Sequence, residues 1–128
     1  MKDEGTRADL RDRTKDFALR IVWLYQALPR SDGAAQVLGK QVLRSGTSVA
    51  AHYREAYRAK SNLGFVSKLE GALQELDETD LWLELLGHSD VIKGSRIAPL
   101  RAERNELIAI FVTMTKNVKA RRRSNPVT

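Results

Sequence analysis

Cysteine is absent from this 128-residue sequence, which excludes a disulfide scaffold, a zinc-thiolate site and a cysteine nucleophile. Long apolar runs are missing as well, and no stretch approaches the roughly 20 residues that a membrane-spanning helix needs. The N-terminal segment MKDEGTRADLRDRTKD is densely charged, so it does not resemble a secretory signal. We expect a cytoplasmic protein that does not bind membranes.

Acidic residues are missing from the C-terminal segment. After Glu106 the chain has five basic residues and no acidic one: Lys116, Lys119, Arg121, Arg122 and Arg123. The stretch from Ser67 to Asp90 has one lysine and seven acidic residues, a net charge of −6, so the rest carries +12 and the whole chain +6. This asymmetry suggests a nucleic acid or an acidic partner. A solvated C-terminal segment beside one acidic helix explains it equally well.

Proline is scarce, and prolines 29, 99 and 126 together with other turn signals divide the chain into four segments. Within each segment, apolar residues recur at alternating spacings of three and four, as in helices that pack like coiled coils. The most regular repeat is the third: Phe65, Leu69, Ala72, Leu76, Thr79, Leu83 and Leu86. We predict helices at roughly 8–28, 32–59, 62–87 and 96–121.

Residues at the segment boundaries indicate where the helices begin and end. Side chains that can cap a helix N-terminus precede the second and third helices: Ser31 or Asp32, and Ser61 or Asn62. Gly87 is predicted to end the third helix in a left-handed conformation. Pro99 is predicted to lie in the first turn of the fourth helix, where its missing N–H costs least.

The fold class follows from the periodicity. No stretch alternates with a period of two, so we expect no strands. Four helices of about 20 residues joined by short loops predict an all-α, antiparallel up-down-up-down four-helix bundle. We expect a single domain over residues 1–128, with a charged N-terminal extension at about 1–8 and a basic C-terminal tail at about 116–128. Four glycines within helices favour close packing: Gly39, Gly46, Gly64 and Gly71.

Polar side chains interrupt the apolar repeats. Four of them lie three or four residues apart on one face of the second helix: Ser45, Ser48, His52 and Glu55. An uncompensated polar group in a bundle core costs several kcal/mol, so such residues need partners. Glu55, Glu75 and Glu78 are candidates to pair with Arg104 or His52. We therefore predict a structural polar network: Ser45, Ser48, His52, Glu55, Glu75, Glu78 and Arg104.

The polar face does not predict catalysis. Ser48, His52 and Glu55 resemble a hydrolase triad in composition, but side chains stacked on one regular helix leave no free backbone N–H for an oxyanion hole. A di-iron site needs two Glu-x-x-His motifs, which this sequence lacks. The Arg-x(4–6)-His motif of HEPN-type ribonucleases fails too, since seven residues separate Arg44 from His52. We expect no enzymatic activity, no metal and no other cofactor.

The stretch from Arg44 to Leu86 resembles the signature of the bacterial four-helix bundle proteins first noticed inside 23S rRNA intervening sequences. That signature runs R-S-x-T-S-[IV]-x-A-N-x-x-E-[AG], then a serine, Phe-[IV] and K-L, and finally E-x-x-E-T-x-x-W-L-x-L-L. This chain supplies Arg44, Ser45, Thr47, Ser48, Val49, Ala51, Glu55, Ala56, Ser61, Phe65, Lys68, Leu69, Glu75, Glu78, Thr79, Trp82, Leu83, Leu85 and Leu86. The segment from Phe17 to Pro29 resembles the family's first helix, so the resemblance covers roughly residues 15–118. His52 stands where the family usually has asparagine.

The resemblance implies a homopentameric barrel of bundles with a central channel. The family includes the accessory variability determinant of diversity-generating retroelements, a basic protein that binds nucleic acid and its cognate reverse transcriptase. The partners implied for this chain are therefore further copies of itself, RNA or DNA, and a reverse transcriptase.

Ten basic residues are the candidates for nucleic-acid contacts: Lys40, Arg44, Arg54, Arg58, Lys60, Lys116, Lys119, Arg121, Arg122 and Arg123. Phosphate contacts of this kind give affinity with little sequence preference. Only Tyr53 and Tyr57 lie among these residues, so base stacking has weak support. Alternatively, Arg44, Arg54 and Arg58 form salt bridges with the acidic third helix, within or between subunits. The protein would then be a purely protein-interaction or structural assembly module.

Aromatic residues make up only 6% of the chain, but several fit the inner repeats of one bundle poorly. We identify five as candidates for a subunit interface: Trp23, Tyr25, Tyr53, Tyr57 and Trp82. Exposed aromatic side chains at such positions mark an interface. A wider core within one bundle would accommodate the same residues.

Overall fold

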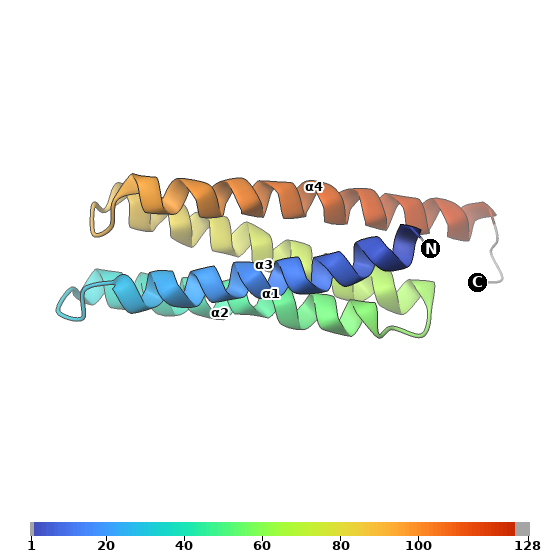
Figure 1. The fold of residues 1–128 in the computed structure, drawn as a ribbon, viewed down its shortest axis with the longest axis horizontal. Coiled ribbons are helices and arrows are strands. Elements are labelled where there is room, and N and C mark those ends of the chain that lie inside the picture. The colour runs from blue at the N-terminus through green and yellow to red at the C-terminus, as the bar shows by residue number, and fades with distance from the viewer. Residues whose placement is uncertain (1, 125–128) are drawn as a thin grey trace.

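Four helices joined by three short loops make up the computed structural model, which describes residues 2–124. The helices are α1 (Lys2–Ala27), α2 (Gly33–Tyr57), α3 (Asn62–His88) and α4 (Gly94–Ser124). Each runs antiparallel to the preceding helix and packs against it (Figure 1). α1 lies diagonally opposite α3, and α2 opposite α4, since no Cα atoms of either pair approach within 8 Å. The predicted all-α up-down-up-down bundle is confirmed, and the described residues include no strand.

Two helices extend beyond their predicted ends. α1 begins at Lys2 instead of residue 8, and α4 spans Gly94–Ser124 instead of 96–121. The charged N-terminal extension and most of the basic tail are therefore helical, while residues 125–128 lie outside the described part. Both extensions are rich in charged residues of good helix propensity and contain no proline, so nothing ends the helices earlier.

The helix N-termini of α2 and α3 are capped by side chains. Asp32 Oδ1 accepts a hydrogen bond of 2.9 Å from the Ala35 N–H, and Ser61 Oγ accepts one of 3.0 Å from the Gly64 N–H. Each cap satisfies an N–H group that has no partner within the helix. Both residues were among the predicted caps.

Two predictions about helix ends are wrong. Gly87 lies within α3, which continues to His88, and the left-handed residue is instead Asp90, with φ of 61° in the loop. Aspartate tolerates this conformation better than most residues because its short side chain bonds locally. Pro99 is the sixth residue of α4 and so lies beyond its first turn. The prediction for Pro99 is wrong because α4 begins at Gly94 and not at the predicted residue 96.

The predicted repeats form the core of the bundle. Every residue of the third repeat, Phe65 to Leu86, is buried. The apolar residues that recur in the first segment are buried too: Leu10, Phe17, Ile21, Leu24 and Leu28. Tyr53, which we had proposed for an interface, is also fully buried, and its ring stacks on Phe111 of α4 with centroids 5.5 Å apart. That proposal is therefore wrong for Tyr53, which packs in the core.

Glycine allows α1 and α2 to approach closely. A Cβ atom at Gly46 would lie 2.8 Å from Ile21 Cγ1, and one at Gly39 would lie 2.6 Å from Leu28 Cδ1. Both distances are shorter than carbon atoms tolerate, so a larger residue at either position would force the facing side chains or the helices to shift. The sequence-based expectation that these glycines favour close packing agrees with this geometry.

Candidate nucleic-acid interface

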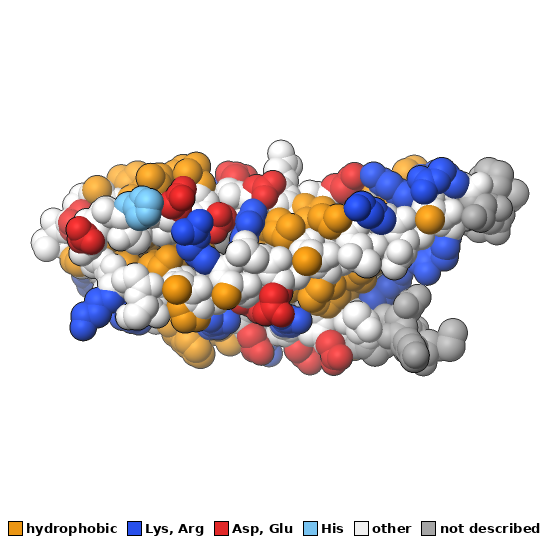
Figure 2. Space-filling model, turned by 90° about the horizontal axis from the view of Figure 1, so that it is seen from above, with side chains coloured by type: hydrophobic (Ala, Val, Ile, Leu, Met, Phe, Trp, Pro, Cys, Tyr) orange, Lys and Arg blue, Asp and Glu red, His pale blue; other side chains and the backbone are white. Residues whose placement is uncertain are grey.

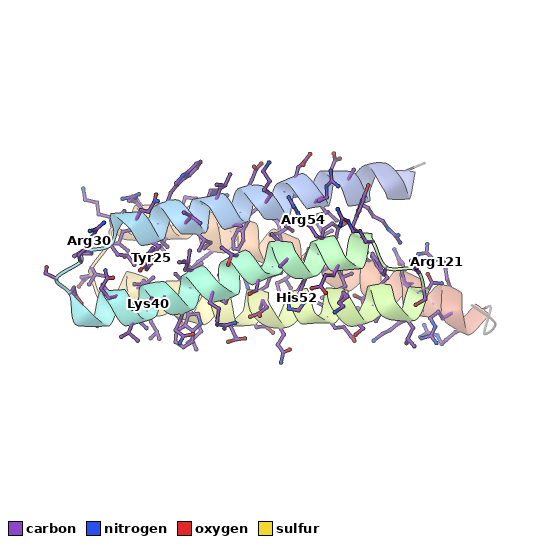
Figure 3. All side chains as sticks on the ribbon, turned by 90° about the horizontal axis from the view of Figure 1, so that it is seen from below. Tyr25, Arg30, Lys40, His52, Arg54 and Arg121 are labelled. Atoms are coloured by element: carbon purple, nitrogen blue, oxygen red, sulfur yellow. The ribbon has the colours of Figure 1, made fainter. Side chains whose placement is uncertain are left out.

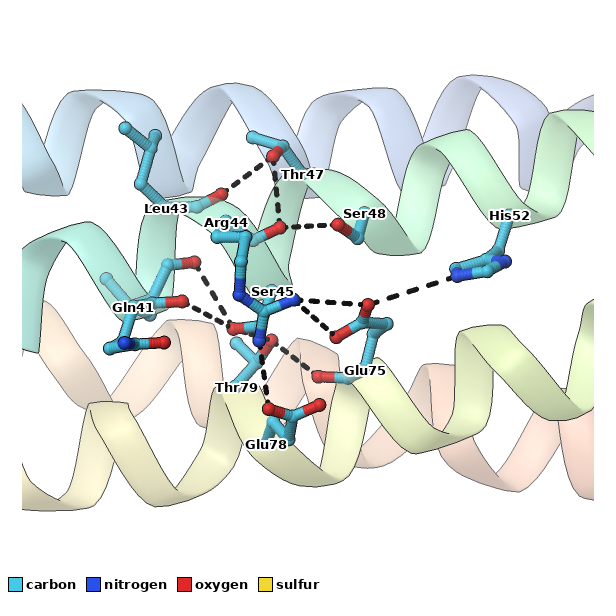
Figure 4. Close-up of polar contacts among 11 residues, drawn as sticks. Gln41, Leu43, Arg44, Ser45, Thr47, Ser48, His52, Glu75, Glu78 and Thr79 are labelled. Atoms are coloured by element: carbon cyan, nitrogen blue, oxygen red, sulfur yellow. Dashed lines mark hydrogen bonds and ion pairs between the residues drawn. The ribbon is translucent and has the colours of Figure 1, made fainter.

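The polar face of α2 meets α3 through a buried pair of hydroxyl groups (Figure 4). The Thr79 hydroxyl donates to Ser45 Oγ at 2.9 Å, and Ser45 donates to the Gln41 carbonyl at 3.0 Å. Thr79 Oγ1 also lies 2.7 Å from the Glu75 carbonyl. Both side chains are fully buried, and each has the partner that a buried polar group requires.

Arg44 extends this contact to the surface. Its guanidinium lies 3.3 Å from Glu75 Oε1 and 2.9 Å from Glu78 Oε1, so it joins two carboxylates of α3 to α2 (Figure 4). His52 Nε2 lies 3.9 Å from Glu75 Oε2, and its buried Nδ1 has no hydrogen-bond partner among the described residues. The ring packs on Gly71, where a Cβ atom would lie 2.9 Å from Nδ1. Arg44 was a candidate for nucleic-acid contacts, but its side chain forms salt bridges within the protein.

The other members of the predicted network lie apart from these contacts. Ser48 donates to the Arg44 carbonyl of its own helix at 2.6 Å. Glu55 pairs with Lys68 at 2.9 Å, and the hydrogen bond from Lys68 lowers the pKa of Glu55. Ser48 is therefore bonded to its own helix and Glu55 to Lys68. No contact among the described residues joins these two side chains to His52 as a triad.

Arg104 was predicted to pair with Glu55, Glu75 or Glu78, and that prediction is wrong. It donates to Asp77 Oδ1 at 2.6 Å and to the Leu76 carbonyl at 3.1 Å. The reason is geometric, because Arg104 on α4 reaches the side of α3 that faces α4. Glu75 and Glu78 contact α2 instead. The predicted network is therefore divided between two helix interfaces.

Most of the candidate basic residues gather at one end of the bundle. α2 and α4 run in the same direction, so their C-terminal ends lie together, beside the start of α1 (Figure 1). Lysine and arginine side chains cluster at the right-hand end in Figure 2, and Figure 3 shows Arg121 near that end and Lys40 toward the other. We call the following residues the basic end: Arg54, Arg58, Lys60, Lys116, Lys119, Arg121, Arg122 and Arg123.

Internal pairing removes little of this charge. Lys119 lies 3.1 Å from Glu70, but six residues of the basic end form no ion pair with any described residue: Arg54, Arg58, Lys60, Lys116, Arg122 and Arg123. Five of the six are exposed and Arg122 is half-buried. Within one chain, the predicted alternative of salt bridges to α3 therefore applies to Arg44 but not to Arg54 or Arg58, and salt bridges between subunits stay a prediction.

Two arginines of α1 also belong to this end, although they were not among the candidates. The Arg7 guanidinium carbon lies 4.2 Å from the centroid of the Phe65 ring, and that of Arg11 lies 5.3 Å from the Tyr57 ring. Such stacking holds a guanidinium in place while leaving its N–H edges available. The antiparallel topology could have revealed both, because it places the start of the first helix beside the ends of the second and fourth.

The described surface also carries two apolar patches. Leu19 and Trp23 lie one turn apart on α1, with 39% and 58% of their surface exposed. Leu81 and Leu85 lie one turn apart on α3, with 47% and 39% exposed. We call these pairs the α1 patch and the α3 patch. Trp23 thus agrees with the expectation of an exposed aromatic residue.

The family follows from comparison with known proteins. Residues 7–113 match the family model described as 23S rRNA-intervening sequence protein. The chain belongs to this family. The 23S rRNA-intervening sequence family match covers most of α1, all of α2 and α3, and α4 as far as residue 113, so it ends before the basic residues of the last turns of α4.

A solved structure supports this membership of the 23S rRNA-intervening sequence family. It is the crystal structure of a protein of unknown function from the S23 ribosomal protein family of Bacteroides thetaiotaomicron. The identity is 36%, the TM-score is 0.79, and the alignment covers 86% of this chain and 97% of that one. No curated protein matches the chain. Among the described residues, no helix is long and apolar enough to cross a membrane, and no group of three or more side chains is arranged to hold a metal ion.

Proposed function

We propose that this protein is a non-enzymatic, homo-oligomeric member of the 23S rRNA-intervening sequence family that binds RNA or DNA in the cytoplasm through its basic end. The observation that supports this function is the gathering of cations from α1, α2 and α4 at one end of the bundle, most of them without an internal partner. Positive charge concentrated in this way attracts the phosphate backbone and contributes affinity with little sequence preference.

The local charge balance supports phosphate contacts. Glu55 and Glu70 at this end are each paired with a lysine. The first turns of α1 add four acidic residues, Asp3, Glu4, Asp9 and Asp12, which offset only part of the remaining positive charge. Tyr57, which is 36% exposed beneath Arg11, offers one stacking surface for a base. A protein partner with an acidic face, such as a reverse transcriptase, is a second candidate for the same surface, because charge complementarity would also steer it there.

We also propose that the oligomer is a ring, of five copies as the resemblance implies. The α1 and α3 patches lie on diagonally opposite helices, so their exposed faces point away from each other. α1 and α3 run in the same direction, and both patches lie near their C-terminal ends, at one level of the bundle (Figure 1). A contact between the α1 patch of one copy and the α3 patch of the next is heterologous, and repetition of such a contact forms a ring when the rotation from copy to copy closes.

The charges around the patches favour the same contact. Residues 71–88 of α3 include five acidic residues and no lysine or arginine, and all five form ion pairs with α2 or α4. Near the α1 patch in the sequence lie three basic residues, Lys15, Arg20 and Arg30, and one acidic residue, Asp16. Opposite charges around two apolar patches steer one copy onto the next and disfavour contacts of α3 with α3. If the protein is instead a structural assembly module that binds no nucleic acid, it would use the α1 and α3 patches alone, and the basic end would have no role.

Salt-dependent binding measurements test the nucleic-acid function. The triple variant Arg54→Gln, Arg58→Gln, Lys60→Gln should bind single-stranded RNA about tenfold more weakly or worse, and its log-affinity should fall less steeply with log salt, by about one unit per lost phosphate contact. A matched control removes three exposed, unpaired cations from the other end: Lys40→Gln, Lys93→Gln, Arg96→Gln. Equal losses in both variants, or affinity no better than that of an unrelated protein of the same net charge, would contradict the proposal.

A further inference from the structure

A small cleft opens at the basic end, between the start of α1 and the last turns of α4. Its volume is about 60 Å³, and the residues that line it come from both helices: Thr6, Arg7, Met114, Asn117, Val118 and Arg121. A water molecule needs about 10–15 Å³ of such space, so the cleft has room for a few heavy atoms and not for a whole nucleotide. None of these described lining residues carries a carboxylate.

The α1 side of the cleft is anchored in the core. The Tyr53 hydroxyl donates to the Arg7 carbonyl at 2.8 Å, and Tyr53 itself is fully buried against Phe111. The Arg7 guanidinium lies over the Phe65 ring. These contacts hold the backbone and the side chain of Arg7, while its guanidinium N–H groups donate to no described residue. A guanidinium held in advance loses little conformational entropy when an anion binds.

The α4 side supplies complementary donors. Asn117 and Arg121 lie four residues apart on α4 and therefore share one helix face. Figure 3 shows Arg121 near the end of the bundle. Together with Thr6 and Arg7, the cleft residues include two guanidinium groups, one amide and one hydroxyl. The planar guanidinium group of arginine donates two parallel, charge-assisted hydrogen bonds to a pair of phosphate oxygens.

We propose that this cleft binds the terminal phosphoryl group of a nucleic-acid strand, an inference that rests on the proposed nucleic-acid function. A terminal phosphate monoester presents three free oxygens and nearly two negative charges, whereas an internal phosphodiester presents two free oxygens and one charge. Four donor groups around one small cleft match the monoester better. In this arrangement the exposed cations of the basic end contact the phosphodiester backbone of the strand. The cleft binds the phosphate at the end of the same strand.

Binding of two single-stranded RNA oligonucleotides that differ only in a 5′-phosphate or a 5′-hydroxyl tests the proposal. The full-length protein should bind the 5′-phosphorylated strand about tenfold more tightly, the effect of one charge-assisted hydrogen bond. Arg7→Gln and Arg121→Gln should each abolish that preference, and each should weaken binding of the 5′-hydroxyl strand no more than Arg58→Gln does, because all three residues belong to the basic end. The matched control Arg58→Gln should weaken binding of both strands equally. Equal affinity of the unmodified protein for the two strands would overturn the proposal.

A second measurement separates failure of the cleft from failure of the nucleic-acid function. Inorganic pyrophosphate should raise the melting temperature of the full chain and not that of Arg121→Gln, with sodium sulfate at equal ionic strength as the reference. If pyrophosphate acts in this way but neither oligonucleotide binds, the cleft is a phosphoryl site and the nucleic-acid function is wrong. If oligonucleotides bind without end preference and pyrophosphate has no effect, the cleft proposal is wrong and the nucleic-acid function stands. Arg7→Lys, which retains the charge, controls for any loss of α1 packing in Arg7→Gln.

Discussion

Ser45 and Thr79 are buried hydroxyl side chains that bind each other across the interface of α2 and α3. Ser45 also donates to the Gln41 carbonyl, and the one Thr79 hydroxyl hydrogen is shared between Ser45 and the Glu75 carbonyl. The pair therefore costs little desolvation energy and fixes which residues of the two helices lie opposite each other. A buried polar pair of this kind can specify helix register, as polar residues do in coiled coils. Arg44 and its two carboxylates continue the same contact at the surface, where solvent weakens an ion pair.

A double-mutant cycle should show that the two hydroxyl groups stabilise the bundle as a pair. Thr79→Val and Ser45→Ala should each lower the free energy of unfolding by about 1 kcal/mol, because each leaves the other hydroxyl with fewer partners. The double variant should lose clearly less than the sum of the two. Urea unfolding at one fixed protein concentration measures all four proteins. Exposed Ser67→Ala serves as the control and should change stability by less than about 0.5 kcal/mol; strict additivity would contradict the pairing.

Between helices, α1 and α2 approach closely at Gly46, which lies against Ile21. Gly46→Ala should lower the free energy of unfolding by about 1–3 kcal/mol, since the added methyl group overpacks the interface. Gly33→Ala is the matched control, because a Cβ atom at Gly33 meets nothing within 4 Å and should leave stability nearly unchanged. Thermal and urea unfolding of the two variants measure the difference. A Gly46→Ala protein as stable as the original would show that the helices separate without cost.

α3 and α4 are tied by Arg101, which donates to both carboxylate oxygens of Asp80, at 2.9 and 3.2 Å. The hydrogen bond from Arg101 lowers the pKa of Asp80. Because its pKa is depressed in the folded state, Asp80 contributes stability that is fully present above the unfolded value of about 3.9 and is lost as pH falls through the folded value. The free energy of unfolding of Asp80→Asn should therefore fall less steeply than that of the original protein as the pH is lowered from about 5 to about 2.

Acid titrations of stability, followed by circular dichroism, measure this slope. Asp16→Asn provides the control, since Asp16 is exposed and has no ion pair among the described residues. It should retain the pH dependence of the original protein. If Asp80→Asn also retains it, the ion pair of Asp80 with Arg101 does not contribute to acid stability.

The sequence was sufficient for the helices and insufficient for the pairing of charges between them. Apolar spacing determines which face of a helix is buried, so Phe17, Leu69 and Phe111 could be assigned to the core in advance. Which carboxylate Arg104 meets depends on how far α3 and α4 rotate about their own axes, and a repeat of three and four does not specify that rotation. The residues of the basic end were identified from composition, but Arg7 joined them only through the topology.

For the whole molecule, the arrangement of the two apolar patches distinguishes a ring from a symmetric dimer. Trp23→Asp disables the α1 patch and Leu85→Asp disables the α3 patch, and both residues are exposed, so each variant should still fold as a bundle. In a heterologous ring every contact uses one patch of each kind. Each variant alone should therefore be monomeric, while light scattering of the original protein should give a closed ring of five chains.

Mixing the two variants tests the geometry of the contact. The Trp23→Asp chain retains an intact α3 patch and the Leu85→Asp chain retains an intact α1 patch, so one functional contact can form between them and no further one. An equimolar mixture should therefore produce heterodimers and nothing larger by light scattering. A symmetric α1–α1 contact predicts otherwise, because the Leu85→Asp protein would then assemble alone and the mixture would add nothing. A monomeric original protein at micromolar concentration would contradict the ring altogether, and the apolar patches would then have no role in self-association.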